Sequence, residues 1–398
     1  MNLRDNFPQL SRTVYGKPLV YLDNAATSLR PVSVIERWTD ISSRSTANLH
    51  RAVHHVAAEA TEAYEQARDA VRAFINALER EEVIFTSGTT HAINLAAWSI
   101  GEAFIGAGDE IIVSESEHHS NLVPWQMLCG RKGATLKVLP VDDSGHLCID
   151  ALPGMLGPQV KIVCVTHVSN VLGLVNPVRR IADICHAHGV QLLVDGAQGI
   201  VHQKVDVQAL GCDFYAFSGH KMYGVPGTGV LWGRRELLEQ MPPMFGGGEM
   251  IETVRWRGST WAPLPRKFEA GTQDISGVPC FVQAIETMKE MPQDEAVRDY
   301  VYEALTHIDG LRLFGTSDDR SEKVPLFSFA VQGAHHEDLA LILDKMGIAV
   351  RSGQMCAEPL MDRFGVTGML RASFAPYNTM QEAEYFVSSL LKAIKMLR

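Results

Sequence analysis

The chain has 398 residues, of which 46% are hydrophobic and 21% charged, and its formal net charge at pH 7 is −10. This acidic balance argues against nucleic acid or an anionic membrane as the main partner, and no uninterrupted apolar run is long enough to span a bilayer. Because the start "MNLRDNFPQL" has no apolar signal core and the seven cysteines form no CxxC pair, we expect reduced thiols in a cytoplasmic protein, without a disulfide framework or metal site.

A chain of this length usually forms more than one core, and we therefore predict two domains with a cleft between them. In the middle of the chain, apolar segments alternate with helical or loop segments, and strands are predicted at 110–114, 161–166, 190–194, 214–217 and 229–232. The segment 178–189 has the apolar spacing of a helix and ends at Gly189, a residue suited to a helix C-terminus. This alternation predicts an α/β fold with a mostly parallel sheet covered by helices.

After about residue 280 the pattern changes to that of a smaller α+β domain. The predicted elements are a helix over 281–291, a strand over 325–331, a helix over 336–347, a strand over 348–350 and a closing helix from Met380. We place the large domain at residues 20–280. The small domain is predicted to combine residues 1–19 with 281–398.

Several polar residues follow predicted strands, at the edge where ligands bind in open α/β sheets. Thr89 and Thr90 begin an amphipathic helix, where backbone N–H groups and hydroxyls suit an anion, although ordinary helix capping explains them equally well. An acid after a strand is also often a helix cap, so each residue alone is weak evidence. Together they indicate one site, and the residues that follow the other strands are Glu117, His118, His119, Asn170, Asp195 and Gln198.

Lys221 follows the apolar segment "CDFYAF" directly, within "FSGHKMYG". Position alone favours an ordinary strand end, where a lysine marks the start of solvent. A buried lysine, an upstream acid such as Asp195 and an anion site are, however, what pyridoxal phosphate requires for a Schiff base, a protonated pyridine nitrogen and a phosphate cradle. Other templates fit poorly, because "GVPGTG" lacks the strand-then-helix setting of a dinucleotide fingerprint and no GxxxxGK stretch occurs.

The chain resembles fold-type I pyridoxal-phosphate enzymes of the class-V aminotransferase family, specifically cysteine desulfurases of the SufS-like second group. Matching segments run in order over nearly the whole chain, among them "YLDNAATSLRP", "TSGTTHAINLAA", "EHHSNLVPWQ", "THVSNVLG", "SGHKMYG", "FEAGTQD", "RSGQMCAEPLM" and "LRASFAPYNT". The resemblance implies an enzyme that converts L-cysteine to L-alanine, keeps the sulfur as a persulfide and supplies it for iron–sulfur cluster assembly. Selenocysteine and cysteine sulfinate are further candidate substrates.

The resemblance also implies how the cofactor is bound. Lys221 forms the Schiff base and moves protons at the substrate carbon, while Asp195 pairs with the pyridinium nitrogen. Gln198 bonds the phenolic oxygen, and His118 stacks on the ring and acts as an acid or base. The residues expected to hold the phosphate are Thr89, Thr90, Ser218, His220 and, from the other subunit, Thr272.

A second set of residues is implied for the substrate. Asn170 and Arg371 suit the carboxylate of the amino acid, the arginine through a bidentate pair, and Arg351 and His50 complete the predicted set. Cys356, in a loop of the small domain, is the nucleophile that attacks the substrate sulfur. The implied active unit is a homodimer that passes sulfur to a small SufE- or SufU-like acceptor protein.

The chain departs from the resemblance just before the nucleophile, where it has Gln354 and Met355 in place of two histidines. A lost histidine removes a cation that favours the thiolate, so the preference among cysteine, selenocysteine and cysteine sulfinate stays open. Two other interpretations also stay open. One is another enzyme on this fold, kynureninase-like or an epimerase, which needs no Cys356. The other is a protein that keeps the fold but acts as a sulfur carrier or activating partner.

Overall fold

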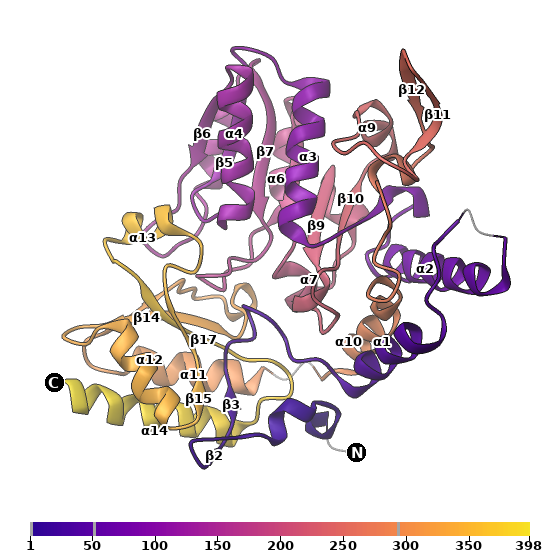
Figure 1. The fold of residues 1–398 in the computed structure, drawn as a ribbon. Helices are drawn as coiled ribbons and strands as arrows, with labels where there is room; N and C mark the ends of the chain where they lie inside the picture. Colours follow the sequence, from indigo (N-terminus) through magenta and orange to yellow (C-terminus); the bar gives the residue numbers. More distant parts are fainter. Residues whose placement is uncertain (1–2, 51–52, 293–294) are drawn as a thin grey trace.

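The structure, a computed structural model, describes residues 3–50, 53–292 and 295–398. Its largest element is a seven-stranded sheet with the strand order β4-β10-β9-β8-β7-β5-β6 (Figure 1). Strand β10 pairs antiparallel with both of its neighbours, whereas the pairings from β9 through to β6 are parallel. The predicted mostly parallel sheet is therefore confirmed. The strands are β4 (Val83–Thr86), β5 (Glu110–Ser114), β6 (Thr135–Leu139), β7 (Val160–Thr166), β8 (Gln191–Asp195), β9 (Phe214–Ser218) and β10 (Gly229–Gly233).

The central strands are recognisable in the sequence because helices cover both faces of the sheet, which makes nearly every residue apolar. In β7, Ile162 and Cys164 pack in one core cluster, whereas Val163 and Val165 point to the opposite face and pack in another. All five predicted strands are present, with ends that differ by at most one residue. Strands β4 and β6 were not predicted, since β4 is only four residues long and β6 is a half-exposed edge strand.

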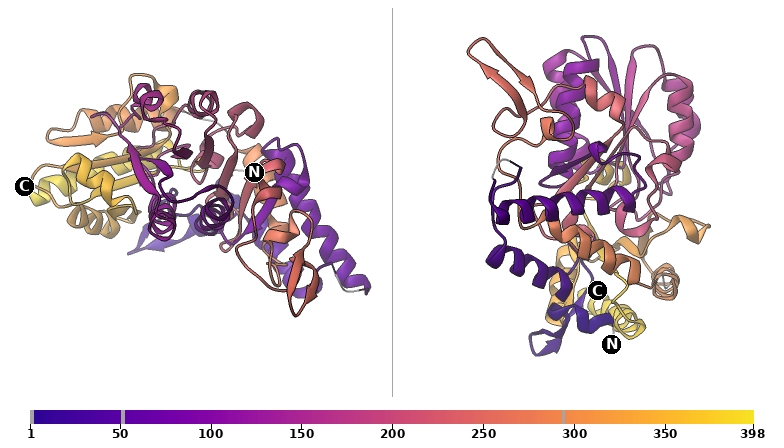
Figure 2. Two further views of the ribbon diagram at one scale, coloured as in Figure 1. Left: turned by 90° about the horizontal axis from the view of Figure 1, so that it is seen from above. Right: turned by 90° about the vertical axis from the view of Figure 1, so that its right-hand side faces the viewer.

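Helices lie on both sides of this sheet, as the two views of Figure 2 show. On one face, α3 (Thr89–Phe104), α4 (Val123–Lys132) and α9 (Arg235–Gln240) contribute to the same apolar cluster. On the other face lie α2 (His55–Phe74) and α6 (Val178–Ala187), and the latter is followed by Gly189 with φ 71°, as its predicted C-terminal role requires. The remaining elements of this region are α1 (Val32–Arg44), α5 (Leu152–Met155), α7 (Gly199–His202), α8 (Val207–Leu210) and the projecting hairpin of β11 (Ile251–Arg255) and β12 (Gly258–Trp261).

The C-terminal part forms a second, antiparallel sheet with the order β13-β14-β17-β16, packed against helices. The predicted helices and strands are all present, with ends that differ by at most two residues. The closing helix begins, as predicted, at Met380, after a capping box formed by Thr379 and Glu382. The elements are α10 (Phe281–Glu290), α11 (Ala296–Thr306), β13 (Leu311–Phe314), β14 (Leu326–Val331), α12 (His336–Lys345), β15 (Ile348–Ala349), β16 (Arg351–Gly353), α13 (Glu358–Phe364), β17 (Met369–Ser373) and α14 (Met380–Leu397).

The N-terminal segment lies against this C-terminal part. After a short hairpin of β1 (Thr13–Val14) and β2 (Lys17–Pro18), strand β3 (Val20–Tyr21) pairs in parallel with β15. Val20 and Leu22 pack in the same cluster as Phe327 and Leu370. The N-terminal residues that pack against the C-terminal part thus extend to Leu22, a few residues past the predicted boundary at position 19. The division of the chain into domains stays a prediction. Among the described helices, none is both long and apolar enough to cross a membrane.

A buried ion pair joins α2 to the sheet and to the loop after residue 265. The Arg68 side chain is fully buried and donates to both oxygens of Glu269, at 2.7 and 2.9 Å, and to the carbonyl of Val83 at 2.7 Å. Glu269 also accepts from the N–H of Phe85 at 2.7 Å. The pair thereby fixes the loop that carries Thr272.

Removing Glu269 should destabilise the fold strongly, because Arg68 loses its buried counter-ion and keeps only the partly exposed Glu65, at 3.0 Å, while the N–H of Phe85 loses its acceptor. We expect Glu269→Ala to lower the free energy of unfolding by about 3–5 kcal/mol, measured by urea titration. The control is Asp183→Ala, which breaks an exposed pair with Arg179 and should change stability far less. Similar losses in the two variants would contradict the importance assigned to the buried pair.

Candidate active site

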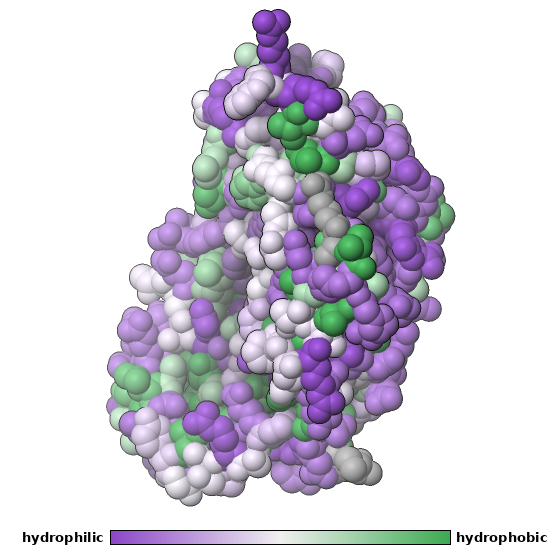
Figure 3. Space-filling view, turned by 45° about the vertical axis from the view of Figure 1, so that its right-hand side comes forward, coloured by the Kyte–Doolittle hydropathy of each residue, from purple (hydrophilic) through white to green (hydrophobic). Residues whose placement is uncertain are grey.

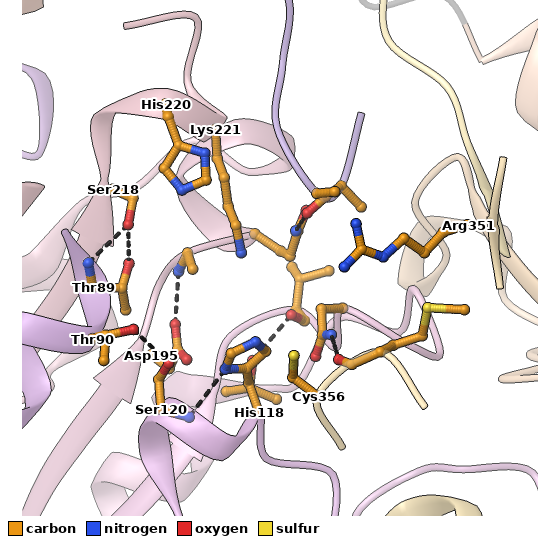
Figure 4. Close-up of a pocket in the computed structure, with 18 of the residues that line it drawn as sticks. Thr89, Thr90, His118, Ser120, Asp195, Ser218, His220, Lys221, Arg351 and Cys356 are labelled. Carbon is orange, nitrogen blue, oxygen red and sulfur yellow. Dashed lines mark hydrogen bonds between the residues drawn. The ribbon is translucent and has the colours of Figure 1, made fainter. Parts of the chain in front are cut away.

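The carboxyl ends of the parallel strands open into a pocket of about 240 Å³, which segments of the C-terminal part help to line (Figure 4). The structure brings most of the predicted site residues together here. Neither Thr272 nor His50 is among the described residues of the lining. The predicted residues that line the pocket are Thr89, Thr90, His118, Asn170, Asp195, Gln198, Ser218, His220, Lys221, Arg351, Cys356 and Arg371.

One end of the pocket is a cradle for an anion at the start of α3. The backbone N–H of Thr89 donates to Oγ of Ser218 at 2.8 Å, and the two hydroxyls lie 2.7 Å apart. Thr90 Oγ1 lies 2.7 Å from Ser120 Oγ. Gly88 precedes the helix with φ 143°, a conformation that favours glycine, and a Cβ there would lie 3.3 Å from Ser218 Oγ. Free N–H groups of the first helical turn and several hydroxyls suit a phosphate group.

Lys221 and Asp195 come from adjacent parallel strands, and both line this pocket. Asp195 is the last residue of β8 and is buried, with Oδ1 accepting from the N–H of Ala197 at 2.9 Å. Burial raises the pKa of Asp195, and the charge of Lys221 opposes this shift. Burial likewise lowers the pKa of Lys221, which the charge of Asp195 opposes. The lysine is therefore more easily deprotonated than one in water.

His118 has a defined orientation. Its Nδ1 accepts from the N–H of Ser120 at 3.0 Å, which leaves Nε2 for other contacts. Burial, and then the charge of Lys221, lower the pKa of His118 to about 3, so that the ring is neutral near pH 7. His220 is similar, because burial and then Lys221 lower its pKa to about 4. Both histidines line the pocket; in Figure 4, His220 lies next to Lys221 and His118 lies nearer to Ser120 and Cys356.

Behind His118 lies a buried carboxyl group, Glu117. It accepts hydrogen bonds from the N–H of Thr166 at 2.6 Å, from Asn121 Nδ2 at 2.7 Å and from the Ser114 hydroxyl. Burial outweighs these bonds and raises the pKa of Glu117 to about 8. Glu117 was noted as a residue after a strand, but its bonds to other strand ends depend on tertiary structure and have no sequence signal.

The opposite wall of the pocket holds two arginines that share one acid. Arg371, in β17, is buried and donates to the carbonyl of Asn170 at 2.8 Å and to Asp23 at 3.2 Å, while its Nε is buried without a hydrogen-bond partner among the described residues. Arg351 is half-exposed and lies 3.7 Å from the other oxygen of Asp23. An arginine with an unsatisfied donor at the pocket wall suits a carboxylate ligand. Asp23 was missed, although it lies in the quoted segment "YLDNAATSLRP".

Two predicted ligand-binding amides bind the backbone instead. Asn170 Nδ2 donates to the carbonyl of Met355 at 2.8 Å, and Gln198 Nε2 donates to the carbonyl of Ala25 at 2.7 Å. Their contacts with substrate and cofactor stay predictions. The same holds for Thr272, which is exposed in a loop, and for His50, whose Nε2 lies 3.9 Å from Glu65.

Cys356 lies in the loop between β16 and α13. Of the seven cysteines it is the exposed one, and Figure 4 shows it beside His118 at the pocket. Met355 and Cys356 have φ values of 54° and 55°, in the left-handed region that non-glycine residues rarely adopt. Each such residue costs about 1–3 kcal/mol, so the loop is held in this form by its surroundings. Cys356 O accepts from the N–H of His119 at 2.7 Å.

The sequence matches the profile of the family described as Aminotransferase class-V over residues 20–386. The chain belongs to this family. Class-V proteins of the cysteine desulfurase type depend on pyridoxal phosphate, which is therefore the cofactor of this protein, and the predicted family, fold type and cofactor are confirmed. The anion cradle, the buried acid and the desolvated lysine fit that cofactor.

Similar proteins match over the full length of this class-V chain. A probable cysteine desulfurase from Xylella fastidiosa is 46% identical over 99% of this chain and 95% of its own length. The crystal structure of the cysteine desulfurase CsdA from Escherichia coli is 39% identical, with a TM-score of 0.91 and all of both chains covered. A cysteine desulfurase from Thermococcus onnurineus NA1 is 35% identical, with a TM-score of 0.93 over 99% of this chain and 98% of that one.

The raised pKa of Glu117 should make stability depend on pH. An acid whose pKa is higher in the folded than in the unfolded state contributes stability that is fully present below the unfolded pKa, about 4.3, and is lost as pH rises through the folded value. The folded value is about 8. We therefore expect the free energy of unfolding of wild type to fall, relative to Glu117→Gln, as pH is raised from about 5 to about 8. Urea titrations at several pH values test this, and parallel pH curves for the two proteins would contradict it.

Proposed function

We propose that the protein is a cysteine desulfurase that converts L-cysteine to L-alanine and keeps the sulfur as a persulfide on Cys356. The observation that carries the proposal is the exposed Cys356 at a pocket that also contains Lys221 and Asp195. Full-length relatives that are cysteine desulfurases support it. A kynureninase-like enzyme or an epimerase has no use for a thiol at this point.

The proposed cofactor contacts follow from the pocket lining. Lys221 would bind pyridoxal phosphate covalently, Asp195 would face its pyridine nitrogen, and His118 would stack on its ring. The phosphate would lie at the start of α3. When bound, the cofactor supplies an electron sink for the bonds that break at the substrate carbons. The residues proposed to hold its phosphate are Thr89, Thr90, Ser218, His220 and, from a second subunit, Thr272.

Lys221 and His118 are the groups proposed to move protons. Burial lowers the pKa of Lys221, so the neutral amine needed to accept a proton is easier to form than in water. His118 is neutral near pH 7, because its pKa is lowered to about 3, and since its Nδ1 accepts a hydrogen bond, its one ring proton is on Nε2, which can donate. These two side chains give the pocket both an acid and a base.

The substrate carboxylate is proposed to bind at Arg371. This guanidinium is fixed by Asp23 and by the carbonyl of Asn170, and its buried Nε has no hydrogen-bond partner within the part of the chain that the structure describes. Asn170 and Arg351 line the same wall, and His50 is proposed to act from a second subunit. A pre-oriented arginine fixes the amino acid with little loss of rotamer freedom on binding.

Cys356 is proposed to take the sulfur. Its thiolate attacks the sulfur of the substrate, an S–S bond forms, the Cβ–S bond breaks, and a proton delivered to carbon completes L-alanine. Atoms and charge balance, since one thiol and one cysteine give one persulfide and one alanine. Because Cys356 is exposed, the persulfide is within reach of another protein. We propose that this partner is a small SufE- or SufU-like acceptor and that the sulfur goes to iron–sulfur cluster assembly.

We propose further that the active unit is a homodimer. The described chain exposes several large hydrophobic residues, and the hairpin of β11 and β12 carries Val254, Trp256 and Trp261, which are 56%, 106% and 45% exposed. Figure 3 shows hydrophobic residues in patches among hydrophilic ones on one face of the molecule. A second copy covering such a surface would explain why Thr272 and His50 lie outside the pocket of their own chain.

The first prediction of this proposal concerns Lys221. In Lys221→Ala the amine that holds the cofactor is absent, so turnover of L-cysteine should be lost while the protein stays folded. Borohydride reduction followed by mass spectrometry should attach the cofactor permanently to wild type at residue 221 and leave the variant unlabelled. Normal turnover by the variant, or labelling of another lysine in wild type, would refute the assignment.

The second prediction concerns Cys356. Cys356→Ser replaces a strong nucleophile by a weak one, so it should bind the cofactor but form almost no alanine from L-cysteine. Selenocysteine and cysteine sulfinate should still react, because their leaving groups depart without thiolate attack. The measurement is alanine formation from all three substrates, with Cys148→Ser, a half-buried cysteine, as the matched control. The assignment fails if the serine variant desulfurates normally or if the wild-type persulfide forms on another cysteine.

A further inference from the structure

One residue to which the family resemblance assigns no role, His119, holds the chain at two points directly after the Cys356 side chain. Its backbone N–H donates to the carbonyl of Cys356 at 2.7 Å, and its ring Nε2 accepts from the N–H of Glu358 at 3.1 Å. These two bonds hold Cys356 and Glu358, the first and last residues of the segment 356–358. His119 opens the 3₁₀ turn His119–Asn121, directly after His118.

The ring of His119 supplies a cap that α13 lacks. Ala357, at the N-cap of that helix, has no side-chain acceptor, and Pro359 has no N–H. The N–H of Glu358 would therefore be without a partner, as helix-start donors are unless a side chain or water reaches them. His119 accepts this bond from a segment more than two hundred residues away in the chain.

The cap matters because the residues before it are strained. Met355 and Cys356 both have left-handed φ values, and such a backbone persists only where its surroundings hold it. Asn170 Nδ2 holds the carbonyl of Met355 at 2.8 Å, and His119 holds the carbonyl of Cys356. After the turn, at the start of α13, the N–H of Glu358 donates to the His119 ring. Without this bond, the start of α13 and the strained turn can relax together.

We propose that His119 is a positioning residue for the nucleophile: its ring, which accepts a hydrogen bond at Nε2, caps α13 and thereby holds Cys356 at the pocket. It acts through the loop and touches neither substrate nor cofactor. The inference rests on the proposed function, because it assumes that Cys356 is the nucleophile. Two consecutive residues then have different roles: His118 lines the pocket, and His119 holds the loop that carries the Cys356 thiol.

The test compares His119→Leu, which removes the acceptor, with His119→Gln, whose side-chain oxygen can take the place of Nε2. Both are tested as holoenzymes, and His188→Leu, at an exposed histidine at the end of α6, is the matched control. The first measurement is the rate at which iodoacetamide alkylates Cys356, followed by mass spectrometry. We expect the leucine variant to react about threefold faster or more, because the loop opens more often, and the glutamine variant to react at the wild-type rate.

The second measurement separates positioning of the thiol from general damage. Alanine formation from L-cysteine should fall about tenfold or more in His119→Leu, since small misplacements of a reacting group are costly. The KM for L-cysteine and the turnover of cysteine sulfinate should stay near wild type, and His119→Gln should recover most of the L-cysteine activity.

The outcomes are distinguishable. Unchanged alkylation and turnover in His119→Leu overturn the inference alone, and equal losses on both substrates overturn it too, because a purely structural residue would cause them. Full activity of Cys356→Ser overturns the proposed function, and the inference with it.

Discussion

The site depends on two buried ionisable groups, the amine of Lys221 and the carboxyl group of Asp195, in a pocket where burial disfavours the charged form of each. Burial shifts the pKa of Lys221 down and that of Asp195 up, and each opposes the shift of the other. Burying either charge alone would be more unfavourable, because an isolated ion loses its hydration without gaining a partner of opposite charge. The arrangement exists because β8 and β9 are adjacent and parallel, so that Asp195 at the end of β8 and Lys221 in the turn after β9 reach the same edge of the sheet.

At this edge of the sheet, each strand end contributes a different part of the site. Strands β4 and β9 end at the anion cradle, β8 ends at Asp195, and the turn after β5 delivers His118 and His119. The second sheet contributes the opposite wall through Arg371 in β17 and Arg351 in β16. Asp23, near β3, links these two arginines, so the N-terminal segment helps to form this wall of the pocket. The pocket is thus assembled from three stretches of chain that are far apart in sequence.

Sequence was sufficient where a signal is local. Strands buried on both faces are apolar throughout, and their apolar runs located five strands; Gly189 and Met380 marked helix ends. Most pocket residues were found because polar groups follow those strands, although the cofactor and the individual roles came from the family resemblance. Asp23 was missed, and the bonds of Glu117 could not be foreseen, because both residues bind partners that are distant in the chain. Gln198 and Asn170 illustrate a related limit, since sequence gives an amide's position but not which partner it chooses.

The departure at Gln354 and Met355 has a physical consequence that is visible in the loop. Gln354 Nε2 donates to Glu358 at 3.0 Å and Met355 is buried, so neither position places a cation beside the thiol. Positive charge lies near Cys356 in another direction: burial lowers the pKa of both Lys221 and Arg371, and the charge of the Cys356 sulfur is among the contributions that oppose this shift. By the same interaction these two cations attract a thiolate. Their pull acts only while Cys356 stays at the pocket, where both of them lie. The hydrogen bonds that keep the loop in its strained form therefore also maintain the electrostatic surroundings of the Cys356 thiol.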